Sequence, residues 1–452
     1  MKYSLFDRYA WYLKGAALLI ALLTYWRFRE LDLSAVYAYV AQGDVIHSAL
    51  LQSVAVSRSI VWDFFGLIDR FVTPHSVRLL RYSGLVILIL DFYLISAVIE
   101  YILGQKFWGF LGVFLAALSP FAIVAAVSGG SAASAVALVL LFLMALYRNQ
   151  YVYAGVLSGI CFAANLPGLI MFLITVLDLL QNLQDKKRLM PKLLSSAAGF
   201  IVVLALAYFY SVYSGSAKVF SVPVSEHDLT WFLNGAVPLL IANVLNVAGV
   251  IYIIVKRRYD AYRTHFQTLM MWVASLALCA AQPTTANLLV ALTVSVILAM
   301  FFVQGFNSLW KIKLVSPDTF VFLFAILFLF GDLYSNNVFL KGIALENSFE
   351  KNEAVSDVVN AIARKAGPTS IVSNFVPAEL SVKLGRKVYE VGDGILPVGN
   401  FTGSSPSVVY VAKRDSQVDS LITGCRPLLD TRLVQNNKSY FVQVVECKAK
   451  DE

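Results

Sequence analysis

The sequence is divided into two parts of different character. Apolar stretches of roughly twenty residues, the length that crosses a bilayer as a helix, recur over residues 15–340 and then stop. Of the whole chain, 59% of residues are hydrophobic and 14% are charged, whereas soluble domains carry about 25% charged residues. The pattern predicts an α-helical polytopic membrane protein with a transmembrane domain over residues 1–345 and a small α/β domain over residues 346–452.

The apolar stretches predict about eleven transmembrane helices. The first lacks the small residues typical of a cleavage site, because it ends in Tyr25 and Trp26 and Arg27 comes directly after it, so we expect it to remain as an uncleaved helix. The predicted spans are residues 15–26, 82–103, 107–128, 131–147, 151–164, 168–180, 193–213, 231–255, 268–281, 288–306 and 319–333.

Positive charges indicate the orientation. Under this count of spans, basic residues fall in every second connection, whereas the short turns on the opposite side carry no charge. Because cytoplasmic loops are enriched in Lys and Arg, the amino terminus is predicted to be cytoplasmic, and residues 29–81 and 346–452 extracytoplasmic, in a plasma membrane such as the bacterial inner membrane. The net charge of +8 follows from these clusters. No basic stripe with interleaved aromatic residues predicts nucleic-acid binding.

Helical and strand-like patterns alternate in the terminal domain, which favours an α/β module. Helices are predicted at residues 350–366, 377–384 and 417–423, and strands at 370–375, 387–391, 407–411 and 440–445. Cys425 and Cys447 both lie in this domain. In an exported domain they are either a disulfide or two buried free thiols, and the sequence leaves both open.

The long exported loop, residues 29–81, carries acidic residues near its start. Asp32, with Glu30 and Asp44 close by, stands where the chain leaves the membrane. A carboxylate there could act as a general base toward an acceptor hydroxyl. Alternatively, Asp32 could cap a helix, since Leu33 and the residues after it can start one. The apolar and polar residues of 36–40 and 60–68 predict helices that lie along the membrane surface.

Basic residues gather toward the end of the same loop. Arg78 and Arg81 are three residues apart and share a helical face, and Arg58 and His75 precede them. Such residues could hold a phosphate or diphosphate, or they could contact lipid headgroups at the start of the second span.

We expect Asp91, in the middle of that span, to be paired with a polar side chain of a neighbouring helix. Asp178, nearer a cytoplasmic end, is expected to reach water.

The order of these parts resembles the GT-C class of membrane glycosyltransferases. Residues 32–43 are similar to the acidic motif of that family's first exported loop, and residues 75–80 to the stretch that leads into its second span. Residues 114–120, 153–159 and 372–388 resemble its third span, its fifth span and its exported domain.

The resemblance implies transfer of a sugar from a polyprenyl-phosphate donor to a lipid, glycan or protein. It implies Asp32 as the general base, with Glu30 or Asp44 as substitutes, and Arg58, His75, Arg78 or Arg81 near the donor phosphate. The chain departs from the family because Leu31 separates the two acids, and Asn165 and Gln282 stand near positions that often carry cations. The alternative is therefore an inactive GT-C-like subunit or scaffold whose terminal domain binds protein partners. No motif predicts a cofactor or metal site, and the need for a divalent cation is left open.

Overall fold

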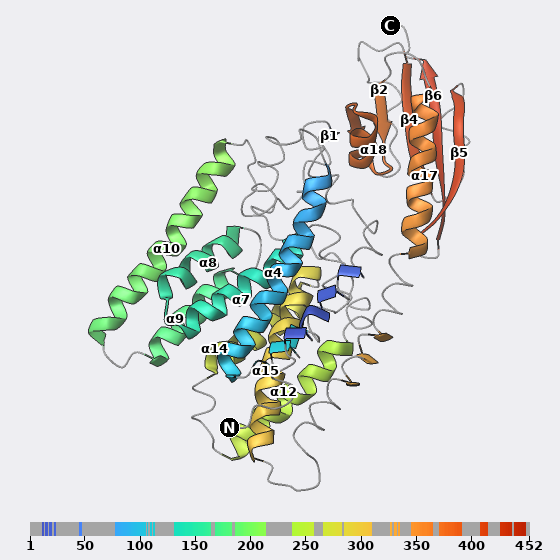
Figure 1. The fold of residues 1–452 in the computed structure, drawn as a ribbon. Coiled ribbons are helices and arrows are strands. Elements are labelled where there is room, and N and C mark those ends of the chain that lie inside the picture. The colour runs from blue at the N-terminus through green and yellow to red at the C-terminus, as the bar shows by residue number, and fades with distance from the viewer. Residues whose placement is uncertain are drawn as a thin grey trace. The chain divides into compact units, whose positions relative to one another are not determined.

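The computed structural model places the chain in two compact units, one helical and one built around a β-sheet (Figure 1). It describes residues 45–47, 77–104, 131–163, 168–182, 186–213, 237–256, 265–282, 284–309, 345–364, 370–390, 407–414, 425–435 and 438–448, with scattered positions in 11–23, 106–113 and 326–334. The two units are described separately below.

The helical unit consists of long apolar helices that match the predicted spans. Four of those described are long and apolar enough to cross a membrane, and four more are apolar but shorter. The helices are α4 (Val77–Leu103), α7 (Ser131–Tyr147), α8 (Tyr151–Ala163), α9 (Gly168–Asn182), α10 (Lys186–Tyr213), α12 (Val237–Val255), α14 (Phe266–Ala281) and α15 (Thr285–Leu309). The predicted spans at 107–128 and 319–333 lie largely outside the described residues.

Helix α15 lies at the centre of this unit and α10 at its edge. The side chains of α15 are almost all buried, against α7, α12 and α14. In contrast, α10 packs mainly on α8 and leaves large apolar residues such as Ile201 and Phe209 exposed. In a bilayer these side chains would meet lipid, which is as apolar as the side chains themselves.

Small residues allow α8 and α10 to approach closely. Gly155 and Gly159 are four residues apart on α8, so they lie on one face of the helix. A β-carbon at Gly155 would overlap the backbone of Ser196 on α10, and one at Gly159 would crowd Val203. This small-xxx-small seam is a common way to pack membrane helices, because backbones in contact gain van der Waals energy that lipid cannot supply.

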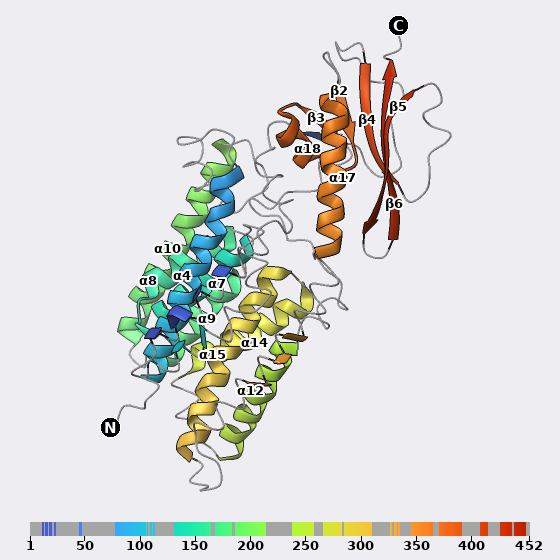
Figure 2. The ribbon, with the colours of Figure 1, turned by 45° about the vertical axis from the view of Figure 1, so that its right-hand side comes forward.

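The second unit is a six-stranded mixed sheet in the order β1-β3-β2-β4-β6-β5 (Figure 2). Strands β1, β3, β2 and β4 run parallel, whereas β6 pairs antiparallel with β4 and β5. The strands are β1 (Val45–His47), β2 (Ser370–Ser373), β3 (Val388–Glu390), β4 (Ser407–Arg414), β5 (Arg426–Gln435) and β6 (Lys438–Lys448).

Two helices, α17 (Leu345–Ala363) and α18 (Pro377–Leu384), cover one face of the sheet. Val355, Val358 and Ile362 of α17 are fully or almost fully buried against inward residues of the strands, among them Val442 and Val444. The three- and four-residue spacings along α17 are those of one helix face, and the two-residue spacing along β6 is that of one strand face. The predicted helices and strands of this domain are therefore present, except that residues 417–423 lie outside the described part.

Strand β1 comes from the first exported loop. Val45, Ile46 and His47 pair in register with Val388, Tyr389 and Glu390 of β3, and α18 contacts β1 as well. Backbone pairing requires both strands to be on the same side of the membrane. The pairing thus agrees with the prediction that residues 29–81 and the terminal domain share one side, and it leaves open which side that is.

Candidate functional site

The predicted catalytic acids and two of the four predicted donor ligands lie outside the described residues. These are Asp32, Glu30, Asp44, Arg58 and His75. Two described segments are close to these residues in the sequence. Strand β1 begins at Val45, directly after Asp44, and α4 begins at Val77, two residues after His75. The roles of these five residues, and whether they come together, remain predictions.

Arg78 and Arg81 lie in the first turns of α4, as the sequence predicts. Their three-residue spacing in a continuous helix sets them on neighbouring positions of one face. Their side chains are outside the described part of the chain. The backbone arrangement is compatible with a shared anionic ligand.

Asp91 is buried in the middle of α4, with 5% of its surface exposed. Its Oδ1 atom has no hydrogen-bond partner among the described residues, so the expected pairing with a neighbouring span is not found there. A buried carboxyl oxygen without a partner is expensive in a membrane interior.

A buried network joins α8, α9 and α14 around Asp178. The carboxylate accepts a hydrogen bond from the Tyr151 hydroxyl at 3.1 Å and one from the Gln267 amide at 2.7 Å. Asp178 has no exposed surface. The expectation that it reaches water is wrong, because the ends of three helices close over it, an arrangement the spacing along one helix does not reveal.

Tyr147, at the end of α7, extends this polar region. Its hydroxyl lies 2.7 Å from Thr268 Oγ1 and 3.3 Å from His265 Nδ1, at the start of α14. By the predicted topology all these helix ends are cytoplasmic, on the side away from the exported loop. The network therefore reads as a structural connection between helices. A Tyr or Gln near the end of an apolar span is the only signal in the sequence that could have pointed to it.

Glu100, near the end of α4, has two partners: it forms an ion pair with Lys14 and accepts a hydrogen bond from Ser96 at 2.7 Å. Lys14 lies at the start of the first apolar stretch, so the pair ties the first two spans together at the predicted cytoplasmic side. Such a pair at a membrane boundary satisfies both charges.

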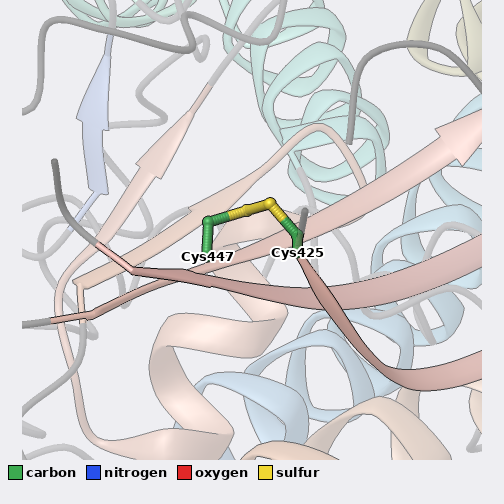
Figure 3. The surroundings of a disulfide bond; sticks show 2 residues. All are labelled: Cys425 and Cys447. Atoms are coloured by element: carbon green, nitrogen blue, oxygen red, sulfur yellow. A yellow bond between two sulfur atoms is a disulfide. The ribbon is translucent and has the colours of Figure 1, made fainter. Parts of the chain in front are cut away.

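Cys425 and Cys447 form a disulfide between the start of β5 and the end of β6 (Figure 3). Their Cα atoms are 4.5 Å apart, within the range that disulfides span. The two cysteines of the helical unit, Cys161 and Cys279, are free and buried. The sequence had left a disulfide and two free thiols open for the first pair, and the structure shows the disulfide. Burial also raises the pKa of Tyr410, which packs in the same cluster as both half-cystines.

Within the described ranges, no group of three or more His, Cys, Asp and Glu side chains is placed to hold a metal ion. Of the exported loop and its borders, the described ranges thus include β1 within the loop, which pairs with the terminal domain, and the start of α4 at the loop's end.

The fold is that of known membrane proteins, although the sequence has diverged far from them. No family model matches the chain, and no curated protein sequence does. Two crystal structures of ArnT from Cupriavidus metallidurans match 95% of this chain and 97% of their own, with a TM-score of 0.57. One is bound to undecaprenyl phosphate at 13% sequence identity, and the other is the apo state at 12% identity. The chain is therefore similar in fold to ArnT, and four of its described helices are long and apolar enough to cross a membrane.

Proposed function

We propose that the chain transfers a sugar from a polyprenyl-phosphate donor to a lipid, glycan or protein acceptor at the extracytoplasmic face of the plasma membrane. The observation that carries the proposal is the fold likeness, over nearly the whole chain, to ArnT bound to undecaprenyl phosphate. That likeness supports a polyprenyl-phosphate lipid as the ligand.

In this proposal Asp32 is the general base, with Glu30 and Asp44 as the substitutes. It would take a proton from the acceptor hydroxyl while that oxygen attacks the sugar carbon, and the polyprenyl phosphate would leave from the opposite face. Arg58, His75, Arg78 and Arg81 would stabilise the charge that develops on the leaving phosphate. The position of Arg78 and Arg81 at the start of α4 supports this assignment, because it sets two cations at a helix end next to the exported loop.

The disulfide supports the extracytoplasmic orientation of the terminal domain, and the β1 pairing extends it to the first loop. The strand β1 ties the first loop to the terminal domain, so a single compartment holds both. The disulfide of that domain favours an oxidising compartment, since disulfides are rare in the cytosol. A phosphatase reporter fused after residue 452 should be active, as it folds only outside the cytoplasm, whereas a fusion at 148 should be inactive.

The first experiment separates donor binding from chemistry. Native mass spectrometry of the purified protein in detergent should detect bound undecaprenyl phosphate. Arg78→Gln with Arg81→Gln should weaken that binding by about tenfold or more, because each charge-assisted hydrogen bond contributes about 1.5–3 kcal/mol. Lys256→Gln, an exposed cation after α12, is the matched control. Equal binding by wild type and the double variant would contradict the assigned phosphate site.

The second experiment tests the base. Asp32→Asn should lower sugar transfer by about 10²–10⁴-fold while lipid binding is retained, since it removes only the proton acceptor. Full activity of this variant would show that another residue is the base, and Glu30→Gln and Asp44→Asn would then be compared in the same assay.

The second candidate function is an inactive GT-C-like subunit of a larger complex, with the terminal domain as the contact for protein partners. It is favoured by the departures in the sequence, where Leu31 separates the two acids and Gln282 stands near a frequent cation. Gentle purification from the native membrane distinguishes the two. A stoichiometric protein partner together with no transfer by wild type supports the subunit, and an active lone chain supports the enzyme.

A further inference from the structure

A cavity of about 410 Å³ lies in the terminal domain, between the last turns of α17 and the beginning of β5. Ala361, Leu428 and Leu429 provide apolar surface in it. The cavity is open to solvent, and its polar lining consists of Asp357 and Asn360 from α17, Arg364 directly after it, Arg426 from β5 and Glu446 from β6, of which all but Glu446 are exposed. The volume lies toward the small end of ligand pockets, which typically measure about 300–1,000 Å³. It suits a small molecule.

The helix residues reach the cavity because of their spacing. Positions 357, 360, 361 and 364 follow the three- and four-residue repeat that marks one face of an α-helix. The neighbouring positions Val358 and Ile362 face the buried core. Asp357 and Arg364 are two turns apart, or about 10 Å along the axis. Along α17, the cavity thus has a negative end and a positive end.

Four of these polar side chains are free to bind something else. Within the described residues, Asp357, Asn360, Arg364 and Arg426 take part in no side-chain hydrogen bond and no ion pair. Glu446, which is the register partner of Arg426, does have an interaction of its own. The free lining groups are therefore two cations, one amide and one carboxylate.

The strand side of the cavity is held in place by the covalent structure. The register of β5 on β6 shifts between Pro427 and Leu429, which is a β-bulge, and Leu428 at the bulge lines the cavity. A bulge bends its strand and redirects a side chain. The disulfide between Cys425 and Cys447 joins the residues next to Arg426 and Glu446. The strands therefore cannot separate at this point, so this side of the cavity is preorganised.

We propose that this cavity binds a small anionic saccharide, meaning a sugar that bears one phosphate or carboxylate group. Arg364 and Arg426 take the anionic group, because guanidinium groups match phosphate and carboxylate oxygens with paired hydrogen bonds. Asp357 and Asn360 take hydroxyl groups of the ring. Ala361, Leu428 and Leu429 contact its C–H surface. Asp357 disfavours a ligand with negative charge at both ends, which is why one anionic group is specified.

The test uses the full-length protein in detergent and isothermal titration calorimetry with glucose 6-phosphate, glucose and inorganic phosphate as probes. Glucose 6-phosphate should bind more tightly than either of the other two, because only it engages both ends of the cavity. Arg364→Gln and Arg426→Gln should each weaken its binding by about tenfold or more. Ala361→Phe, which fills the cavity, should abolish binding.

Arg432→Gln is the matched control, because Arg432 is an exposed arginine of β5 that bonds Ser439 and does not line the cavity. An intact Cys425–Cys447 disulfide on a non-reducing gel checks that each variant is folded. Binding that is equal in wild type, Arg364→Gln and Ala361→Phe would overturn the site. Equal affinity for inorganic phosphate and glucose 6-phosphate would overturn the saccharide part, and no binding of any probe at millimolar concentration would overturn the proposal as a whole.

Discussion

At the scale of single residues, acids with a structural role can be told apart from the candidate catalytic acids. Asp178 is buried and accepts hydrogen bonds from Tyr151 and Gln267. Asp178→Ala would leave both donors without that acceptor, and we expect a loss of about 2–4 kcal/mol of stability. Differential scanning fluorimetry of the purified protein should show a lower unfolding temperature. Asp178→Asn, which keeps one acceptor, should lose less, and Asp430→Ala on the exposed face of β5 should leave the temperature unchanged.

The cysteines make a second residue-scale prediction. Of the four cysteines, Cys161 and Cys279 are free and the other two are joined. Alkylation of the denatured, non-reduced protein should label only the free pair, and all four after reduction. With a sequence separation of 22 between the half-cystines, Cys425→Ser should cost the terminal domain about 3 kcal/mol, because the unfolded chain gains entropy. Faster proteolysis of that domain would report the loss, and labelling of all four cysteines without reductant would contradict the disulfide.

Among the elements, the α8–α10 pair depends most on side-chain size. A β-branched residue at Gly155 would be forced against the backbone of Ser196, so Gly155→Val should cost about 1–3 kcal/mol through overpacking. The unfolding temperature in detergent measures it. Val152→Leu is the control, since that position on α8 is 47% exposed and can take the extra carbon. An unchanged temperature for Gly155→Val would mean that the two helices are not held at this seam.

On the scale of the whole molecule, the pairing of β1 with β3 links the first loop to the end of the chain. Ile46 and Tyr389 are register partners, and neighbouring strands lie about 4.8 Å apart, within disulfide range. Ile46→Cys with Tyr389→Cys should therefore cross-link under mild oxidation. Ile46→Cys with Arg432→Cys, across the sheet on β5, should not. Cross-linking is read as a mobility shift on a gel after cleavage of the chain between the two positions. Failure of the first pair would contradict β1.

The sequence predicts the spans well because hydrophobic length is a local property. Helices α7, α8 and α9 match their predicted spans to within two residues. Strand β5 was missed because it is an edge strand with Pro427 and three charged residues, features that such strands tolerate. The Asn436-Asn437 pair that precedes β6 was the available hairpin signal. The burial of Asp178 and the three-residue β1 depend on partners far away in the chain, which no local pattern specifies. The roles assigned to Asp32 and the loop arginines remain predictions.

The position of β1 has a consequence for biosynthesis. Val45 is made early, but its partner Val388 is made only after almost the entire helical unit. At synthesis rates of about 5–20 residues per second the wait is on the order of tens of seconds. During that time β1 has no strand to pair with. Once β3 has formed, its edge stays unpaired until β1 binds to it. Pairing of β1 with β3 is therefore among the last events of assembly. It can occur only in chains where an even number of membrane crossings separates the two strands. The six-stranded sheet is thus complete only in chains that hold both strands on one side of the membrane.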